Sequence, residues 1–218
     1  MKLFLKIAFY FISLSILFNS CSLRHHAGFT PAKAFEVQNS DFIANQFQRV
    51  LFNTQIQAFG KDFSGLLFIK LVDKDDYRFV FLTQLGLKIF DIEFKNNEFQ
   101  VHQLVSYLDR KSFRKVLEND LKLIIQKPQE AHKKAYFKHK SDTSFLLREK
   151  DKRQFHYFQY QNNRIRQKEN ASCWFSKTKI LYTYKGGERP SSIHIKHSGI
   201  NLEWTLLPIK KKLKLETE

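Results

Sequence analysis

The chain has 218 residues, a length suited to one domain, and its hydrophobic fraction of 43%, with 23 Phe, supplies a sizeable core. Seven Gly and four Pro exclude a disordered or low-complexity chain. The formal net charge of +16 calls for an acidic partner, but no nucleic-acid motif accompanies it, so we expect no nucleic acid to bind.

The first twenty residues follow the order of a secretory signal. Lys2 and Lys6 form a positive n-region, and an apolar run over 7–18 follows, which is shorter than the roughly 20 residues that cross a bilayer. Ser20 and Cys21 follow it and resemble the bacterial lipobox. We therefore expect residues 1–20 to be a lipoprotein signal peptide and Cys21 to carry acyl chains such as palmitate. An uncleaved signal anchor is the alternative.

The lipidated cysteine decides several further expectations. If Cys21 is acylated, Cys173 has no partner, which excludes a disulfide. Ser22 follows in place of Asp, the residue that signals inner-membrane retention in many enteric bacteria, so we expect the outer membrane. The next residues lack the acidic signature of surface export, which favours the periplasmic face. There, the positive charge favours anionic headgroups, lipopolysaccharide phosphates or an acidic protein.

Alternating apolar and polar residues predict antiparallel strands after a polar tether over 21–45. We interpret the basic stretches 133–140, 148–153 and 164–168 as solvated strand or loop faces, and 209–218 as a basic flexible tail. The folded domain should span 46–208. The expected strands are 50–58, 63–72, 77–85, 90–95, 98–105, 144–149, 154–160, 174–184, 191–197 and 202–207.

One helix is expected between the two sets of strands. Asp109 is a plausible N-cap, and Pro128 closes the segment. Apolar residues recur between them at helical spacing, at Phe113, Val116, Leu117, Leu121 and Ile124. The pattern thus predicts a mainly β (α+β) fold.

A strand meander, one amphipathic helix and further strands behind a lipobox are similar to the LolA and LolB lipoprotein-sorting fold. The matching segments are FSGLL over 63–67, FVFLTQLG over 79–86 and LKIF over 87–90. LolB-like proteins commonly have a proline, a leucine and a glycine at this connection, and here Gln84 replaces the proline. The resemblance covers roughly residues 47–125.

The resemblance implies an antiparallel incomplete β-barrel with one or more helices covering a concave apolar face that accepts acyl chains. In LolB-like proteins the loop leucine protrudes and helps to transfer acyl chains, and Leu85, followed by Gly86, is the matching position. The alternative is that Leu85 is an ordinary core residue at a strand end. The candidate groove residues are Val50, Phe52, Ile56, Phe79, Phe81, Phe90, Ile92 and Phe94.

No motif specifies catalysis, a metal or a cofactor, so we expect none of them. His194 and His197 lie an odd number of residues apart in an expected strand, which sends them to opposite faces. His132, His139 and His156 have no acid or thiol cluster that spacing would place beside them.

The expected function is therefore that of an outer-membrane lipoprotein that binds acyl chains or lipidated cargo in an apolar groove. We expect a monomer that contacts membrane lipid and a periplasmic carrier or lipidated cargo protein. The alternative is a structural or assembly lipoprotein that binds another envelope protein.

Overall fold

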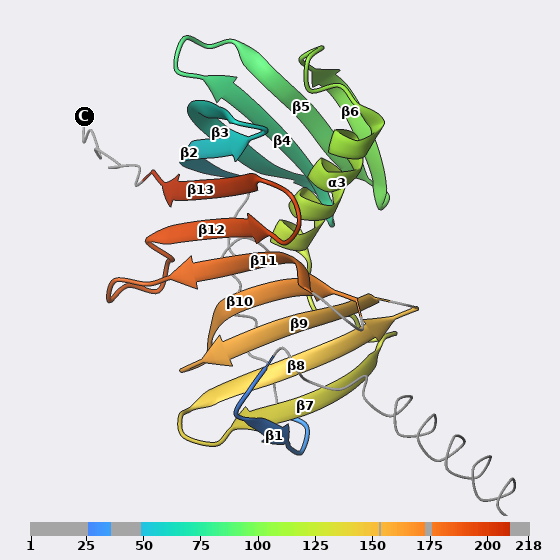
Figure 1. Cartoon of the computed structure of the whole chain (residues 1–218), viewed down its shortest axis with the longest axis vertical. Helices are drawn as coiled ribbons and strands as arrows, with labels where there is room; N and C mark the ends of the chain where they lie inside the picture. Colours follow the sequence, from blue (N-terminus) through green and yellow to red (C-terminus); the bar gives the residue numbers. More distant parts are fainter. Residues whose placement is uncertain (1–25, 36–48, 153, 173–175, 210–218) are drawn as a thin grey trace, which may run out of the picture.

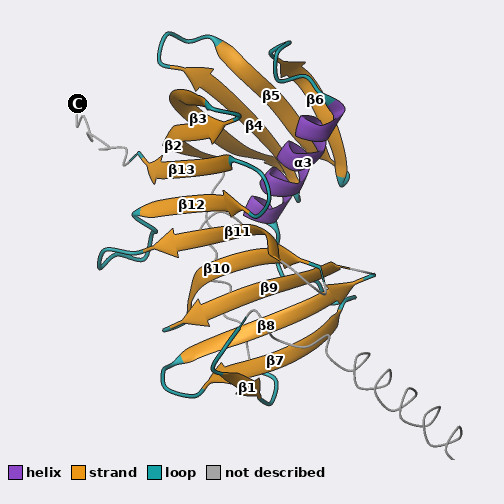
Figure 2. Cartoon of the chain, viewed as in Figure 1, coloured by secondary structure: helices purple, strands orange, loops and turns teal. Residues whose placement is uncertain are grey.

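The computed structural model of the chain describes residues 26–35, 49–152, 154–172 and 176–209, and Figures 1 and 2 show their arrangement. Cys21, Cys173, the signal peptide and the basic tail beyond residue 209 lie outside the described residues. The elements are β1 (Phe29–Pro31), β2 (Arg49–Ala58), β3 (Lys61–Asp73), β4 (Asp76–Thr83), β5 (Lys88–Lys95), β6 (Glu98–Leu104), α3 (Lys111–Ile125), β7 (Lys133–His139), β8 (Ser144–Asp151), β9 (Gln154–Gln161), β10 (Arg164–Ala171), β11 (Ser176–Thr183), β12 (Ser192–His197) and β13 (Leu202–Pro208).

The described strands form one antiparallel sheet in the order β1-β7-β8-β9-β10-β11-β12-β13-β2-β3-β4-β5-β6. The last strand, β13, pairs with β2, so the two ends of the domain meet in the middle of the sheet. The edge strands β1 and β6 are far apart in this order, and the sheet does not close. Helix α3 crosses the inner face of the curved sheet (Figure 2). The structure thus confirms the predicted class, an incomplete antiparallel barrel with a helix over its concave face.

The hairpins of the first half follow from local sequence. Strand β2 alternates buried and exposed positions along nearly its whole length, as the period-two pattern predicts. The β5–β6 turn places Asn96 and Asn97 at φ values of 51° and 65°, a left-handed conformation that Asn tolerates better than most residues. In the β3–β4 turn the backbone N–H of Lys74 donates to the Asp73 carboxylate, at 2.7 Å.

The core lies between α3 and the inner faces of the strands. Phe52, Phe81, Phe90 and Trp204 are almost fully buried there, together with Leu121 of the helix. The predicted helix is therefore confirmed, but Asp109 as its N-cap is wrong. Arg110 occupies the cap position without a side-chain cap bond, because the Asp109 carboxylate accepts two hydrogen bonds from Arg114 instead.

The second half of the sheet differs most from the prediction. Strands β1, β7 and β10 were not predicted. Residues 26–35 belong to the expected tether, yet β1 pairs with β7, and His26 is buried against Tyr157 at a ring-centroid distance of 4.6 Å. This segment covers a small second core on the outer face, which includes Phe137, Leu146 and Phe155.

Two basic stretches that we expected to be solvated form strands β7 and β10. Lys168 of β10 is 1% exposed, so the solvated interpretation is wrong for this residue. Its ammonium group donates to the carbonyls of Ile124 and Gln126, both at 2.9 Å. A buried cation thus binds the carbonyls at the C-terminal end of α3, where the negative end of the helix dipole favours it.

Candidate functional site

Four connections gather at one end of the first half of the sheet, which we call the apical end. These are the β2–β3, β4–β5 and β12–β13 turns and the β6–α3 connection. The register places them together, because Ala58 pairs with both Lys61 and Leu202, and Gly65 pairs with Thr83. Most of the exposed large hydrophobic side chains of the described residues lie here, namely Phe59 at 60%, Leu85 at 94%, Leu87 at 68%, Tyr107 at 46% and Ile200 at 39%.

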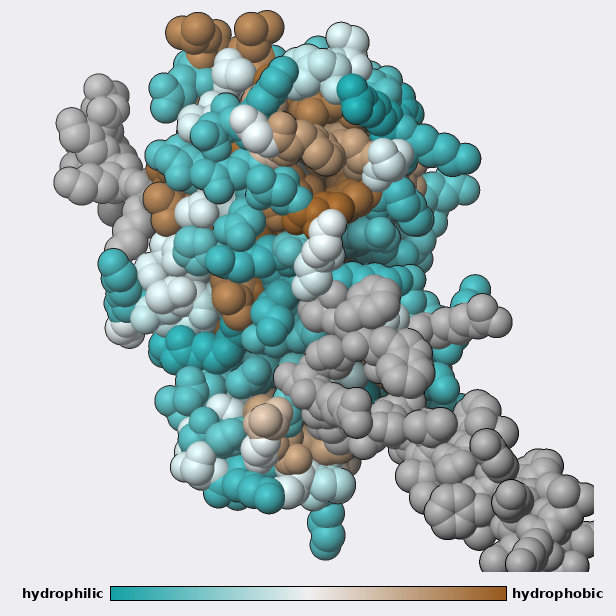
Figure 3. Space-filling model, viewed as in Figure 1, coloured by the Kyte–Doolittle hydropathy of each residue, from teal (hydrophilic) through white to brown (hydrophobic). Residues whose placement is uncertain are grey.

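Leu85 is the most exposed of these side chains and lies at the tip of the β4–β5 turn. Figure 3 shows hydrophobic side chains that protrude at the end of the molecule where Figure 1 draws this turn. Single exposed hydrophobic residues are common on protein surfaces, but two leucines on one turn, both over two-thirds exposed, form a distinct projection. Of the two readings of Leu85, the structure excludes the core position.

The turn that carries Leu85 is held by three hydrogen bonds. The Thr83 N–H donates to the Leu87 carbonyl at 2.8 Å, the Gly86 N–H donates to the Thr83 carbonyl at 3.0 Å, and the Leu87 N–H donates to the Thr83 hydroxyl oxygen at 3.1 Å. Gly86 has a φ of 81°, which L side chains rarely adopt. The turn thus has a defined conformation that fixes Leu85 outside the fold.

Gly65 supports this turn from the neighbouring strand. A Cβ atom at this position would lie 1.9 Å from the backbone oxygen of Leu82, far inside contact distance. Only glycine therefore lets β3 approach β4 this closely just before the turn. The glycine of the FSGLL segment has a structural reason to be there.

A pocket of about 280 Å³ opens at the apical end beside the start of α3. Its lining comes from the β2–β3 turn, the β6–α3 connection and the first turn of the helix: Ala58, Phe59, Lys61, Phe63, Tyr107, Leu108, Arg110, Ser112 and Phe113. Figure 3 shows hydrophobic surface in the upper half of the molecule, around α3. Mostly apolar walls with a few polar groups are typical of ligand pockets.

Aromatic pairs build the walls of this apical pocket. Phe63 and Tyr107 stack with ring centroids 5.9 Å apart, and Phe59 meets Phe113 edge to face, also at 5.9 Å. The Lys61 ammonium group lies 5.4 Å from the centre of the Tyr107 ring. Each wall therefore joins a residue of the β2–β3 hairpin to one that precedes or begins α3. The sequence prediction named none of the lining residues as a site.

The eight predicted groove residues lie elsewhere. They share the inner face of the sheet, as predicted, because Phe79 pairs with Ile92 and Phe81 pairs with Phe90. All eight are buried in the core and none lines the apical pocket. Helix α3 covers the concave face, as predicted, and packs in the same core, so these residues contact protein in this structure. Their contact with an acyl chain stays a prediction.

A buried ion pair joins α3 to the sheet. The Asp120 carboxylate is fully buried and lies 2.7 Å from Nε2 of His197 on β12. Nδ1 of His197 lies 2.8 Å from the Leu202 carbonyl, which can only accept, so Nδ1 carries a proton. Burial, the largest single effect, lowers the pKa of His197. The hydrogen bond to Asp120, the negative charge of Asp120, the Leu202 carbonyl and Glu203 together outweigh it, and the net pKa is raised. Burial raises the pKa of Asp120.

His194 and His197 point to opposite faces, as predicted: His197 meets the helix, and His194 meets Thr205. The expectation that His132 has no acid beside it is wrong. Its Nδ1 lies 3.2 Å from the buried carboxylate of Glu149, which β8 brings to this point from a distance in sequence. Burial raises the pKa of Glu149 despite this contact.

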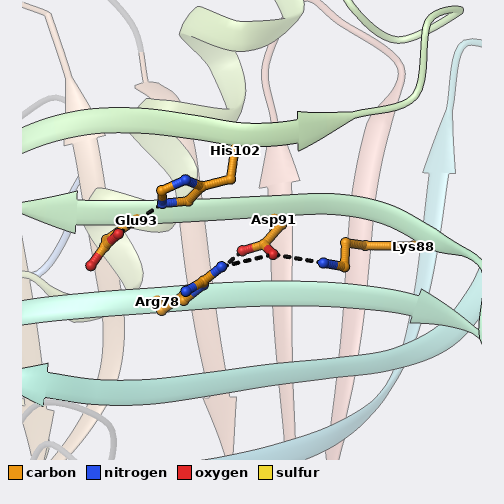
Figure 4. Close-up of polar contacts among 5 residues, drawn as sticks. All are labelled: Arg78, Lys88, Asp91, Glu93 and His102. Carbon is orange, nitrogen blue, oxygen red and sulfur yellow. Dashed lines mark hydrogen bonds and ion pairs between the residues drawn. The ribbon is translucent and has the colours of Figure 1, made fainter.

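Two neighbouring polar groups occupy the outer face of β4, β5 and β6 (Figure 4). Arg78 donates two hydrogen bonds to Asp91, and Lys88 adds a third at 2.8 Å. The Arg78 hydrogen bond chiefly lowers the pKa of Asp91 to about 2. Beside them, His102 lies 2.7 Å from Glu93. None of these residues lines the apical pocket. The Arg78–Asp91 pair joins β4 to β5 around a buried carboxylate, and the Glu93–His102 pair joins β5 to β6, so both serve to hold neighbouring strands together.

Across residues 26–35, 49–152, 154–172 and 176–209, no group of three or more His, Cys, Asp or Glu side chains could hold a metal ion. Within the same ranges, no helix has the length and apolar character needed to cross a membrane.

No family model matches the sequence, and no curated protein matches it significantly. Among solved structures, the chain is similar to a LolA superfamily protein from Nitrosomonas europaea, with a TM-score of 0.44 and 13% identity over 81% of this chain and 93% of that one. It is also similar to a DUF1329 family protein from Desulfovibrio piger, with a TM-score of 0.43 and 8% identity over 77% of this chain and 86% of that one. These similarities assign no role to any residue of this chain.

Proposed function

We propose that this protein binds the acyl chain of a lipid or of a lipidated cargo protein at its apical end. The observation that carries the proposal is the fixed projection of Leu85 at the same end of the sheet as an aromatic pocket. Leu85 is 94% exposed, and three hydrogen bonds hold its turn. A side chain that is kept in water by a built turn contributes nothing to the core, so contact with an apolar partner is the role that remains for it.

The pocket supplies the complementary part of the site. Its volume of about 280 Å³ lies close to the lower limit of about 300 Å³ for small-molecule sites, so it suits part of one chain rather than a whole lipid. Each methylene that leaves water there contributes about 0.8 kcal/mol. Several methylenes therefore suffice for micromolar to millimolar binding after the costs of association.

The test compares Leu85→Glu with Val72→Glu. Val72 is also exposed, at 49%, but lies beside the β3–β4 turn, at the opposite end of the same strands. Both variants should have a free energy of unfolding within about 0.5 kcal/mol of that of the wild type, because substitutions at the surface rarely cost more. Uptake of lipid from vesicles, measured by native mass spectrometry, should fall for Leu85→Glu alone.

Undiminished uptake by a stable Leu85→Glu protein would remove Leu85 from the proposal. Lipid that is absent from every sample, the wild type included, would reject acyl-chain binding and favour a lipoprotein that binds another envelope protein.

The proposal includes anchoring through Cys21 at the periplasmic face of the outer membrane. It rests on the order of residues in the signal and on Ser22 after the cysteine. The Cys21→Ala variant should incorporate no labelled palmitate and should leave the outer-membrane fraction or remain an unprocessed precursor. A Ser20→Ala variant, which keeps the cysteine, is the control and should be labelled normally. Palmitate that remains attached to Cys21→Ala would overturn the lipoprotein assignment.

A further inference from the structure

We propose that the apical pocket selects acyl chains that carry an anionic headgroup. This inference rests on the proposed function and names the class of ligand. Two cations, Lys61 and Arg110, belong to the lining of the pocket, and no carboxylate does. Both side chains are exposed, so their charges face the solvent through which a headgroup would approach.

The two cations come from different elements and flank the same opening. Lys61 begins β3 and rests over the Tyr107 ring at 5.4 Å, a contact that keeps the ammonium group at the aromatic wall. Arg110 immediately precedes α3. The charges therefore converge on the pocket because the β2–β3 hairpin and the β6–α3 connection meet there.

The neighbouring acids do not neutralise these cations. Asp109, next to Arg110, accepts hydrogen bonds from Arg114 on both carboxylate oxygens. Asp62, next to Lys61, points to the opposite side of β3, because successive strand residues alternate between faces. The first turn of α3 has no acidic residue. Within the described part of the chain, the pocket thus presents positive charge beside apolar walls, the complement of an anionic amphiphile.

The experiment uses the full-length protein in a mild nonionic detergent and two ligands with the same acyl chain. Lysophosphatidylglycerol has a net negative headgroup, and lysophosphatidylcholine has none. We expect the first to bind about tenfold more tightly, the effect of two exposed ion pairs, each of modest strength. Glycerol phosphate, the headgroup without the chain, should not bind measurably.

Two double variants locate the effect. Lys61→Gln with Arg110→Gln should bring the two lysolipids to equal affinity. Lys74→Gln with Lys95→Gln removes the same charge from exposed positions at the opposite end of the strands and should keep the tenfold preference. Raising the salt concentration to 1 M should shrink the preference, because the screening length falls to about 3 Å.

Each adverse outcome has a distinct meaning. Equal affinity of the wild type for both lysolipids overturns the inference and leaves the proposed function standing. A preference that survives in Lys61→Gln with Arg110→Gln also overturns it, because the selectivity then lies elsewhere. Failure of both lysolipids to bind overturns the proposed function together with the inference. Binding of glycerol phosphate as tight as that of the lysolipid rejects the acyl chain as the ligand.

Discussion

Removing His197 should destabilise the fold, and the loss should depend on pH. In His197→Leu the Asp120 carboxylate keeps its burial but loses its only hydrogen-bonding partner within the described residues. Breaking a buried ion pair from one side typically costs about 3–5 kcal/mol. Leucine fills most of the space of the imidazole, so the unpaired carboxylate dominates the loss.

The magnitude follows from the energy needed to protonate Asp120. Its unfolded-state pKa is about 3.9, and each pH unit above that value costs about 1.36 kcal/mol to keep the group neutral. The cost is about 3 kcal/mol at pH 6 and about 1 kcal/mol at pH 4.5. A group whose pKa is raised by folding contributes stability below its unfolded pKa and loses it as the pH rises. The deficit of His197→Leu should therefore grow from pH 4.5 to pH 6.

The wild type should lose less stability than the variant over this range, because the hydrogen bond and charge of His197 lower the pKa of Asp120 against the larger effect of burial. Its His197 has a raised pKa, so the contribution of the imidazolium is complete below about pH 6.5 and is lost only as the pH rises through the folded value. Urea unfolding at both pH values, followed by fluorescence of the buried Trp204, gives the free energies.

Two further variants keep the reasoning falsifiable. In Asp120→Asn, the new amide can donate to Nε2 of a neutral His197, so this variant should be nearly as stable as the wild type. Adding His197→Leu to Asp120→Asn should lower the free energy of unfolding by the same amount at both pH values. His194→Leu, on the same strand but bonded to Thr205 on the outer face, should lose less than about 1 kcal/mol. A pH-independent loss in His197→Leu would refute the account.

Three more predictions concern other parts of the fold. Gly65→Ala should lower the free energy of unfolding by about 1–3 kcal/mol, because its Cβ would meet the backbone oxygen of Leu82. The NMR chemical shifts of the adjoining turn should change, and unchanged shifts would contradict the close approach of the two strands. Lys168→Met should lower the free energy of unfolding in urea by about 1–3 kcal/mol, because it removes the ammonium donor from one buried and one partly buried carbonyl. Amide exchange should quicken first at the C-terminal end of α3 rather than at its start. Asp91→Asn should lower the free energy of unfolding by about 1 kcal/mol at pH 7, a figure reduced by solvent screening. This difference from the wild type should vanish as the pH falls from about 4 to about 2, because the folded pKa of Asp91 is depressed. A difference that stays constant with pH would be inconsistent with the ion pair.

The strands of the first half of the sheet could be predicted from the sequence because their residues alternate between apolar and polar or end in residues that favour turns. Strand β2 alternates cleanly, and the Asn96–Asn97 and Asp73–Asp76 turns contain residues that favour turns. Strands β7 and β10 carry no such signal. Their sequences, KKAYFKH and RIRQKENA, mix charged residues into both faces. The ammonium group of Lys168 donates to a carbonyl more than forty residues away in the sequence, and the pattern of neighbouring residues cannot predict that contact.

Only part of the candidate site could be predicted from the sequence. Leu85 was identified through a family resemblance, and its exposure could not be derived from the residues themselves. The apical pocket was missed because its lining comes from two short segments, 58–63 and 107–113, that the topology brings together. Phe59 before Gly60 was the available signal, since a large apolar residue at a tight turn has no core to enter.

The buried polar contacts that hold α3 lie in its middle and at its C-terminal end, whereas the proposed binding site lies at its start. Its middle is held by Asp120, and its last carbonyls by Lys168, both through buried polar contacts. Its first turn has no side-chain cap, and its contacts at the pocket are aromatic, chiefly the edge-to-face pair of Phe113 and Phe59. Aromatic contacts can be exchanged for contacts with an acyl chain at little cost, whereas an unpaired buried charge is expensive. If an acyl chain binds as proposed, we therefore expect Phe59 to move before Asp120 or Lys168 does, because the buried polar contacts keep the rest of α3 on the sheet.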